Sequence, residues 1–347
     1  MRRCLSTSAL ALVLSLGLSA LPGGATALAG QDTHLLVVVG IGGDAEYRER
    51  FLEWGTTLRS AAMERYGLPA ERAVLLAEDP SMSDAISGES RREGLEAEFG
   101  SLATRVGPED RVLLVMIGHG SFRGADATFN IPGPDMPSSD LKSLLDALPT
   151  SRVAVVNTAS ASGPYVESLA APGRTVITAT ASGGERNETQ FGAYFAEAWV
   201  GDQADLDKNG AVSLLEAFQY ARSETARFYE ERNLLLTEHA LLDDDGDAEG
   251  SRDPGGESSD GAVAAGFTMG VPGSRAAATD GTTPIPVSAD SVLTRLYQER
   301  ADFETRVAEL RRLKDSMDPE IYDSELEALL VDLALKNREI RAREGGN

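Results

Sequence analysis

The feature that most constrains the fold is a regular alternation of apolar runs and helical patterns between residues 34 and 250. The apolar runs have the length of buried strands, and they occupy residues 34–43, 72–78, 111–118, 152–160 and 174–182. Helical patterns separate or follow them at about 45–66, 86–105, 138–149, 189–200 and 213–232, with one helical turn at 165–172. Apolar strands joined by helices form parallel sheets that are covered on both faces. The sequence therefore predicts an α/β domain over residues 30–250, with a mainly parallel sheet sandwiched by helices.

The first thirty residues are typical of an export signal. Arg2 and Arg3 give a positive start, residues 8–21 are rich in Leu and Ala, and Ala27-Leu28-Ala29 offers a small-x-small cleavage site. We predict that residues 1–29 are a signal peptide and that the mature protein is periplasmic or extracellular. A membrane anchor is the alternative, but the apolar run is short for a membrane span, and no later segment is apolar enough to cross one.

The amino-acid composition limits the reactive groups and the binding partners that the protein can have. Cys4 is the only cysteine and lies inside the predicted signal, so the mature chain is expected to hold no thiol and no disulfide. The chain carries 55 acidic and 32 basic residues, a formal net charge of −23. That charge argues against nucleic acids and anionic membranes as partners and suits the binding of divalent cations.

The C-terminal part is expected to differ in structure from the α/β domain. Residues 251–287 are rich in Gly, Ser, Asp and Pro and are typical of a flexible linker, with a short apolar strand or docking segment at 262–271 as an open alternative. Apolar residues then recur every seven positions from Leu296 to Met317, and a second apolar stripe follows Asp318-Pro319. We predict a helical hairpin or short coiled coil at 288–347, which either packs within the chain or mediates oligomerisation or partner binding.

Several short motifs were weighed as sites. The segment "GIGGD" at 40–44 joins a strand to a helix, but it lacks the spacing of a nucleotide-binding loop, and a tight turn explains its glycines. His119 directly follows the strand at 111–118 and is flanked by glycines. Because sites in parallel sheets lie at the carboxyl ends of strands, His119 is a candidate site residue. His34 opens a strand, and His239 lacks the Cys or second His of a zinc site.

Three strand ends together resemble the caspase/legumain-like family, in particular the legumain-like cysteine peptidases. They are "VLLVMIGHGS", "AVVNTASASG" and "TVITATASGGERNETQFGAYF", which begin at residues 112, 154 and 175. In that family one strand ends in His-Gly, the next in Ala-Cys-x-Ser-Gly, and a third in a Thr/Ala-rich stretch that helps shape the substrate pocket. The resemblance covers roughly residues 34–250 and implies the same α/β fold.

The resemblance matches the family's histidine to His119 and places Ser160 where the family has its nucleophilic Cys. This departure excludes cysteine peptidase activity and leaves open whether the protein is an enzyme. A serine hydroxyl is far less acidic than a thiol, and it needs a histidine base that a third group usually orients. We therefore expect a non-catalytic peptidase homologue that binds a protein or peptide partner. The alternative is a peptidase or acyl hydrolase with Ser160 as nucleophile, His119 as base, and Ser162 as the spare hydroxyl.

A second constellation predicts a metal site. Residues 205–216, "DLDKNGAVSLLE", fit the EF-hand-like calcium loop D-x-[DN]-x-[DN]-G-x5-E in full. The predicted ligands are the side chains of Asp205, Asp207, Asn209, Ser213 and Glu216 and the carbonyl of Ala211. Val212 supplies the apolar residue that fixes such a loop to the core. The alternative is a solvated acidic turn that caps the helix at 213–232. We expect a weakly bound, structural Ca²⁺.

A third acidic cluster follows at residues 243–247, "DDDGD". It is either a second cation site, with His239 nearby, or a solvated loop, and the sequence leaves both open.

Overall fold

The computed structural model describes residues 32–124, 126–256, 258–270, 306–307, 310 and 319–344. The predicted signal peptide at 1–29 lies outside the described residues. The strands are β1 (Thr33–Val39), β2 (Ala73–Ala77), β3 (Gly88–Glu89), β4 (Arg111–Ile117), β5 (Gly120–Arg123), β6 (Asp126–Phe129), β7 (Met136–Pro137), β8 (Val153–Asn157), β9 (Arg174–Thr178) and β10 (Leu241–Asp243). The helices are α1 (Ala45–Ser60), α2 (Arg92–Arg105), α3 (Ser138–Asp146), α4 (Tyr165–Leu169), α5 (Phe191–Glu197), α6 (Leu214–Glu231), α7 (Ala262–Ala265) and α9 (Pro319–Glu344).

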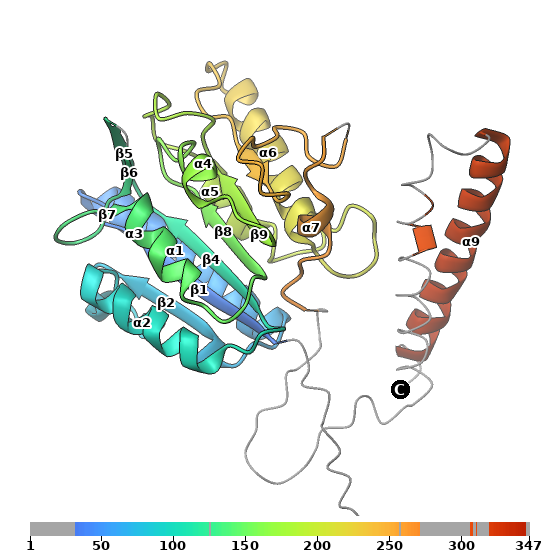
Figure 1. The fold of residues 1–347 in the computed structure, drawn as a ribbon, viewed down its shortest axis with the longest axis horizontal. Helices are drawn as coiled ribbons and strands as arrows, with labels where there is room; N and C mark the ends of the chain where they lie inside the picture. Colours follow the sequence, from blue (N-terminus) through green and yellow to red (C-terminus); the bar gives the residue numbers. More distant parts are fainter. Residues whose placement is uncertain are drawn as a thin grey trace, which may run out of the picture. The chain divides into compact units, whose positions relative to one another are not determined.

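The main sheet has the strand order β10-β9-β8-β4-β1-β2-β3 (Figure 1). Every neighbouring pair in it is parallel except β9 and β10, which run antiparallel. The predicted α/β fold with a mainly parallel sheet is therefore confirmed. The five predicted apolar runs correspond to β1, β2, β4, β8 and β9, because strands buried on both faces carry no polar stripe.

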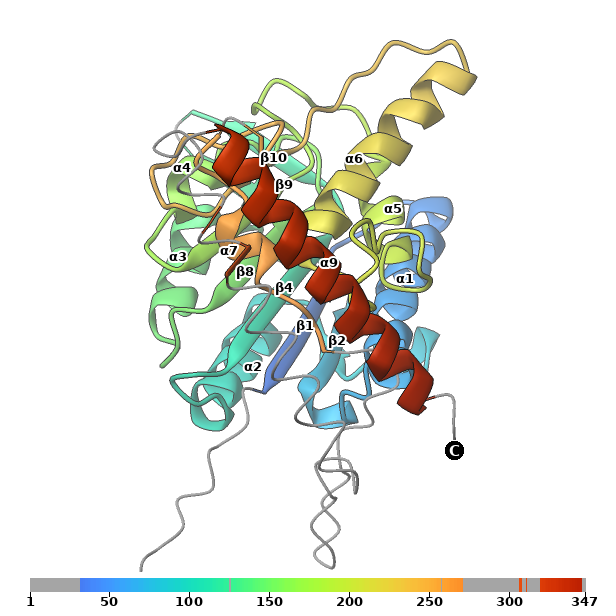
Figure 2. The same cartoon turned by 90° about the vertical axis from the view of Figure 1, so that its right-hand side faces the viewer.

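Helices cover both faces of this sheet, and Figure 2 shows α2, α3 and α4 on one side with α1, α5 and α6 on the other. Strand β1 supplies side chains to both layers in alternation. Leu35, Val37 and Val39 belong to the core beneath α1, α5, α6 and α7, whereas Leu36 and Val38 belong to the core beneath α2, α3 and α4. This period-two division is what a strand covered on both faces produces.

The order in which the chain adds strands to the sheet changes direction between the neighbouring strands β1 and β4. From β1 the chain passes to β2 on one side, and it later returns to β4 on the other side and continues to β8 and β9. Ligand sites in open α/β sheets lie outside the carboxyl ends of the strands at such a reversal. The segments that follow β1, β4 and β8 are thereby brought to one edge, and these include His119 and Ser160.

The helix predicted at about 86–105 begins later than expected. Helix α2 begins at Arg92, because Gly88 and Glu89 pair with Leu76 and Ala77 as the short strand β3. A small antiparallel sheet, β5-β6-β7, also follows β4 and was not predicted. Phe129 of β6 is fully buried in the core beneath α2, α3 and α4, so this small sheet is anchored to the main domain.

At the start of the predicted linker at 251–287, the structure favours the alternative of a docking segment at 262–271. Residues 262–265 form helix α7 rather than a strand, and the amides of Gly261 and Ala264 donate to the Asp244 carboxylate at 2.8 and 2.7 Å. Phe267 and Met269 are buried in the main core. The chain therefore stays packed on the α/β domain through residue 270, because α7 receives a carboxylate cap and apolar anchors follow it. Residues 271–287 lie outside the described part.

The predicted C-terminal hairpin is described only in part. Helix α9 spans 26 residues, and Val307, Leu310, Tyr322 and Leu329 are buried together in a small apolar cluster of their own. Most of residues 288–318 lies outside the described part, so the hairpin stays a prediction. None of the described helices combines the length and apolar character needed to cross a membrane.

Candidate functional site

His119 lies directly after β4, with its ring packed between two aromatic rings of α1. The ring centroid is 4.8 Å from that of Tyr47 and 5.0 Å from that of Phe51, both in edge-on geometry. Burial lowers the pKa of His119, and an interaction with the Gly42 backbone opposes this only in part. The neutral imidazole, the form that can act as a base, is therefore favoured at neutral pH.

Ser160 follows β8, the strand next to β4, and its hydroxyl is held by the backbone beside His119. Ser160 Oγ donates to the Gly120 carbonyl at 3.2 Å and accepts from the Gly120 amide at 3.3 Å. A Cβ on Gly120 would lie 2.5 Å from the Ser160 carbonyl oxygen, so only glycine allows this close approach. The turn predicted to carry a nucleophile and the turn that carries His119 are thus in contact.

The contact joins the two turns but does not place the two candidate side chains in a hydrogen bond. Within the described residues, no hydrogen bond joins Ser160 to His119, and no carboxylate is hydrogen-bonded to the His119 ring. Glu188 lies nearby, but its carboxylate accepts from Tyr47 Oη at 3.0 Å and pairs with Arg50 at 2.8 Å. The Gly120 amide already donates to Ser160 Oγ, so in this arrangement it is not free to hold an oxyanion. A working serine hydrolase needs the serine hydroxyl within reach of the histidine, a third group that orients the histidine, and a free amide for the oxyanion.

Ser162, the spare hydroxyl, has a structural position. It is 1% exposed, its Oγ lies 3.1 Å from Thr180 Oγ1, and it accepts from the Thr180 amide at 3.2 Å. Gly163 lets this turn lie against the segment after β9, since a Cβ there would be 2.4 Å from backbone atoms of Ala181 and Ser182. Ser162 therefore ties two strand ends together.

The calcium loop has the backbone shape that its sequence predicts. Lys208 and Gly210 have φ of 57° and 91°, and the Gly210 amide donates to Asp205 Oδ2 at 2.9 Å. Val212 is fully buried in the main core, as predicted. Ser213 forms an antiparallel bridge with Thr268, so the end of the loop is fixed to the segment that follows α7.

The donor atoms of the loop fit a hard cation. Carboxylate oxygens of Asp205, Asp207 and Glu216 lie within 4.8 Å of one another, although this geometry does not identify an ion. Asp205 Oδ1 is buried without a hydrogen-bond partner, and burial raises the pKa of this carboxyl. A cation at this point would satisfy the oxygen and favour the charged form.

Glu216 has a second role that its position in the loop does not reveal. Its Oε1 accepts from the amides of Leu206 and Asp207 at 2.9 and 3.2 Å. Its Oε2 accepts from the amide and hydroxyl of Ser213 at 2.8 and 2.7 Å, which forms a capping box at the start of α6. Two-oxygen ligation by Glu216 would compete with these bonds. The residues of the predicted cation site are therefore also residues of the alternative, an acidic turn that caps α6.

The other predicted loop positions lie where the pattern requires. Asn209 Oδ1 accepts from the Ala211 amide at 2.9 Å, and the Asn209 side-chain amide donates to Asp207 Oδ2 at 2.8 Å. Ser213 Oγ accepts from the Glu216 amide at 3.2 Å. The structure brings the carboxylates of Asp205, Asp207 and Glu216 together, as expected, while the ligand roles of Asn209, Ala211 and Ser213 and the nature of any bound ion stay predictions.

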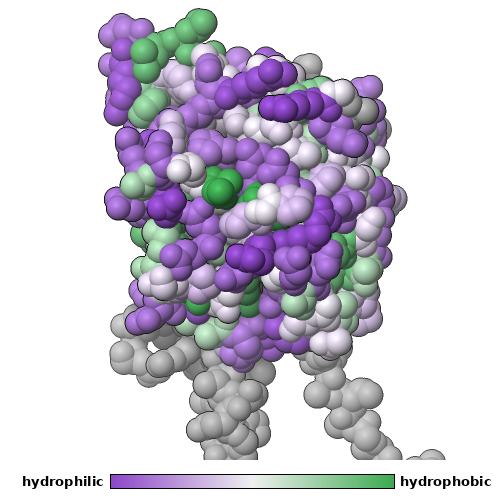
Figure 3. Space-filling model, turned by 90° about the vertical axis from the view of Figure 1, so that its left-hand side faces the viewer, coloured by the Kyte–Doolittle hydropathy of each residue, from purple (hydrophilic) through white to green (hydrophobic). Residues whose placement is uncertain are grey.

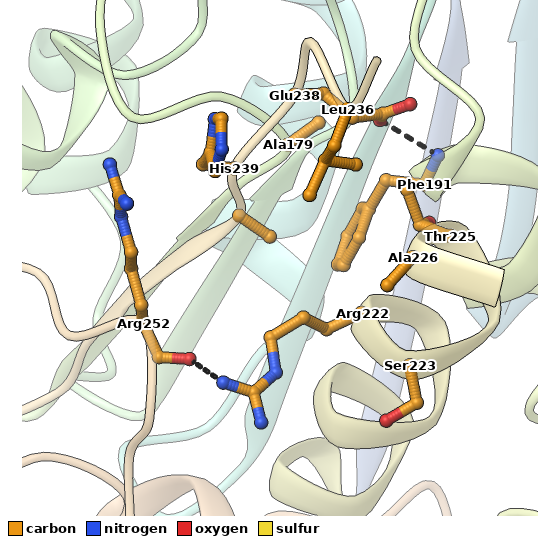
Figure 4. A pocket seen from close by; sticks show the side chains of 11 residues that line it. Ala179, Phe191, Arg222, Ser223, Thr225, Ala226, Leu236, Glu238, His239 and Arg252 are labelled. Atoms are coloured by element: carbon orange, nitrogen blue, oxygen red, sulfur yellow. Dashed lines mark hydrogen bonds between the residues drawn. The ribbon is translucent and has the colours of Figure 1, made fainter. Parts of the chain in front are cut away.

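A cavity of about 330 Å³ beside the end of β9 was not predicted (Figure 4). Its lining residues are Ala179, Phe191, Arg222, Ser223, Thr225, Ala226, Leu236, Glu238, His239, Ala240 and Arg252. His239, set aside above as a zinc ligand, pairs through Nδ1 with Glu185 at 2.8 Å. The Glu185 carbonyl accepts from the Ala161 amide at 2.7 Å, so the cavity wall is joined to the Ser160 turn.

Basic side chains stand at the rim of this cavity. Arg222 donates to the Arg252 carbonyl and, at 3.1 Å, to Asp253 Oδ1. The Arg252 guanidinium extends along the same wall as His239 in Figure 4, and it forms no ion pair within the described residues. Apolar walls with basic groups at the rim suit an apolar ligand that carries negative charge.

The face of the molecule in Figure 3 is mostly hydrophilic, with hydrophobic side chains only in small separate areas.

Glu238 is a buried acid at the back of the cavity. Its carboxylate accepts from the amides of Gln190 and Phe191 at 2.7 and 3.1 Å and from Tyr229 Oη at 3.0 Å. Burial is the dominant cause that raises the pKa of Glu238 from 4.5 to about 7. Between pH 4.5 and about 7, the Glu238 carboxyl is therefore mostly protonated in the folded protein and mostly ionised in the unfolded chain.

This proton linkage predicts a pH-dependent stability. Because the folded-state pKa of Glu238 is raised, its contribution is fully present below pH 4.5 and is lost as pH rises through 7. Between pH 5 and 7 the loss is about 2 kcal/mol of unfolding free energy. Urea denaturation in EDTA should show a steeper fall for wild type than for Glu238→Gln, which lacks this titrating group but keeps the other buried acids with raised pKa, such as Asp243. Equal slopes in the two proteins would contradict the prediction.

Comparisons with known proteins identify no close relative. No protein-family model matches the chain, and no curated protein matches it. Among solved structures, the chain is similar to the Drosophila initiator caspase Dronc, with 11% sequence identity and a TM-score of 0.36. The match covers 75% of this chain and 98% of the caspase chain. The α/β fold described above rests on the strand order and pairing of this chain itself.

Proposed function

We propose that this chain is an exported, non-catalytic relative of the caspase/legumain-like peptidases that binds Ca²⁺ and recognises a protein or peptide partner. The observation that carries the proposal is the state of Ser160, which stands at the position where the family has its thiol. Its hydroxyl is bound to both backbone groups of Gly120 and is not hydrogen-bonded to His119. The resemblance of three strand ends supports the family, and the reversal of strand order between β1 and β4 supports a site at this edge.

The cavity beside β9 supports the binding part of the proposal. It adjoins the Thr/Ala-rich segment that, by resemblance, helps shape a substrate pocket, and Ala179 lines it. Phe191 and Leu236 offer apolar contacts, while His239 and Arg252 offer positive charge or hydrogen-bond donors. A peptide with an apolar side chain next to a carboxylate could place the side chain on the apolar residues and the carboxylate near the basic ones.

A working serine hydrolase is the second candidate. The observation in its favour is the half-buried His119, whose lowered pKa keeps the imidazole neutral and able to accept a proton. Rotation of Ser160 Oγ away from Gly120 would free the hydroxyl and the Gly120 amide together. This candidate makes the opposite prediction in the same assay.

The assay is turnover of a mixed peptide library by purified full chain, with Ca²⁺ or with EDTA. The proposal predicts no cleavage above the buffer background by wild type, Ser160→Ala or His119→Ala under either condition. Cleavage by wild type that is lost in both variants would overturn the proposal and establish the hydrolase. Cleavage that survives in both variants would identify a contaminating peptidase, and a preparation freed of it would then have to show no activity for the proposal to stand.

A further inference from the structure

The loop between β10 and Ser251 gathers a second set of carboxylates, separate from the calcium loop. Leu242 and Ser251 form an antiparallel bridge, with amide-to-carbonyl distances of 2.9 and 2.7 Å, and this bridge closes the loop. Within it, carboxylate oxygens of Asp243, Asp245 and Asp247 lie within 4.8 Å of one another. Like charges at this separation repel each other unless something neutralises them.

Asp243 is the member that points to a ligand. Its side chain is 0% exposed, and although Oδ1 accepts from the Gly246 amide at 3.0 Å, Oδ2 is buried with no hydrogen-bond partner. An unsatisfied charged oxygen in the interior is costly, and natural proteins satisfy such atoms with a hydrogen bond, a counter-charge or a metal. The first two are absent from the described surroundings of Oδ2.

The neighbouring acids add further negative charge around the cluster. Asp244 and Asp260 are also buried, but their oxygens are used, since Asp244 caps α7 and Asp260 Oδ1 accepts from the Asp244 amide at 3.1 Å. Among the described residues, no Lys, Arg or His forms an ion pair with any acid from Asp243 to Asp247 or with Asp260. His239 is committed to Glu185 and does not join the cluster. The described part of the chain therefore supplies no counter-charge to this cluster.

We propose that the loop at 243–249 binds a second divalent cation through Asp243, Asp245 and Asp247. Carboxylate oxygens with no nitrogen or sulfur donor suit the hard cations Ca²⁺ and Mg²⁺. Ca²⁺ fits better, because a loop of exposed and buried carboxylates gives the irregular oxygen shell that Ca²⁺ accepts, whereas Mg²⁺ demands near-ideal octahedral geometry. The same loop is joined to α7 by Asp244, and the chain after α7 leads to Thr268, the bridge partner of Ser213 in the calcium loop.

The test is calorimetric titration of the full chain with Ca²⁺, and separately with Mg²⁺. The variants are Asp245→Asn/Asp247→Asn for this site and Asp205→Asn for the calcium loop, with Glu249→Gln as a control on the same loop. Asp245 and Asp247 are exposed, so their replacement leaves the fold intact. Circular dichroism of each variant checks this.

The inference predicts that Asp245→Asn/Asp247→Asn loses one equivalent of bound Ca²⁺ relative to wild type, while Glu249→Gln keeps both. It also predicts that Asp205→Asn keeps the equivalent bound at the 243–249 loop. Loss of all binding in Asp205→Asn, or unchanged stoichiometry in Asp245→Asn/Asp247→Asn, would overturn the second site. Loss of binding in Asp245→Asn/Asp247→Asn with no effect of Asp205→Asn would overturn the calcium loop instead, so the two failures are distinguishable.

Discussion

Ca²⁺ should raise the melting temperature of the folded chain, and Asp205→Asn should remove the part of that rise that comes from the calcium loop. A loop with a Kd on the order of 10⁻⁴ M gains about 2.7 kcal/mol at a hundredfold excess of free ion over the Kd. For a domain of this size that corresponds to roughly 5–10 °C. Asp205→Asn removes one charged ligand but keeps an acceptor for the Gly210 amide, so the Ca²⁺-free protein should change little.

The comparison is best made in the Asp245→Asn/Asp247→Asn background, where only the calcium loop responds to the ion. Thermal denaturation followed by circular dichroism, with Ca²⁺ and with EDTA, gives the two melting temperatures for each protein. Asp202→Asn is the matched control, because Asp202 is an exposed acid near the loop that pairs with Arg65 instead. An equal Ca²⁺-dependent rise in Asp205→Asn and its parent would refute calcium binding at this loop.

Gly163→Ala should destabilise the protein by about 3 kcal/mol, in line with severe overpacking. The added Cβ would lie 2.4 Å from backbone atoms of Ala181 and Ser182, which cannot move as freely as a side chain. The Ser160 turn and the segment after β9 would be forced apart, and the hydrogen bonds between Ser162 and Thr180 would be lost with them. Urea denaturation gives the change in unfolding free energy.

Gly184→Ala is the control for Gly163→Ala. Gly184 lies in the segment after β9 that Gly163 approaches, but its added Cβ would meet Ser182 Oγ at 3.5 Å, an ordinary contact. Its effect should stay below about 1 kcal/mol, as for most exposed positions. Similar losses for both variants would mean that the two strand ends do not approach each other as described.

The fold was predictable because its strongest signal is local. Strands buried on both faces, such as β1 and β8, are apolar over most of their length, and the helices between them carry their own periodicity. The segment at 262–271 was harder, because α7 depends on a cap from Asp244, which lies some twenty residues earlier in the chain. Nothing in the local pattern marks that partnership, so a short helix resembled linker or strand.

The candidate site was predictable only where one stretch of sequence holds the whole arrangement. The calcium loop is such a stretch, and its glycine, acids and buried Val212 all occupy the expected positions. The cavity beside β9 joins residues that range from Ala179 to Arg252, and the contact of His239 with Glu185 spans 54 positions. A single sequence carries no signal for such a contact. The sequence left the helix cap and the cation site at Glu216 as alternatives, because one residue type can serve as either.

The central claim is that Ser160 is not a nucleophile, and covalent labelling tests it most directly. Wild type, Ser160→Ala and His119→Ala are incubated with a serine-directed phosphonate, with and without Ca²⁺, and then weighed by intact-protein mass spectrometry. With its hydroxyl bound to Gly120 and no base hydrogen-bonded to it, Ser160 should stay unmodified, and all three proteins should keep their original masses. One phosphonyl group on wild type that is absent from both variants would contradict the account and identify a working serine hydrolase.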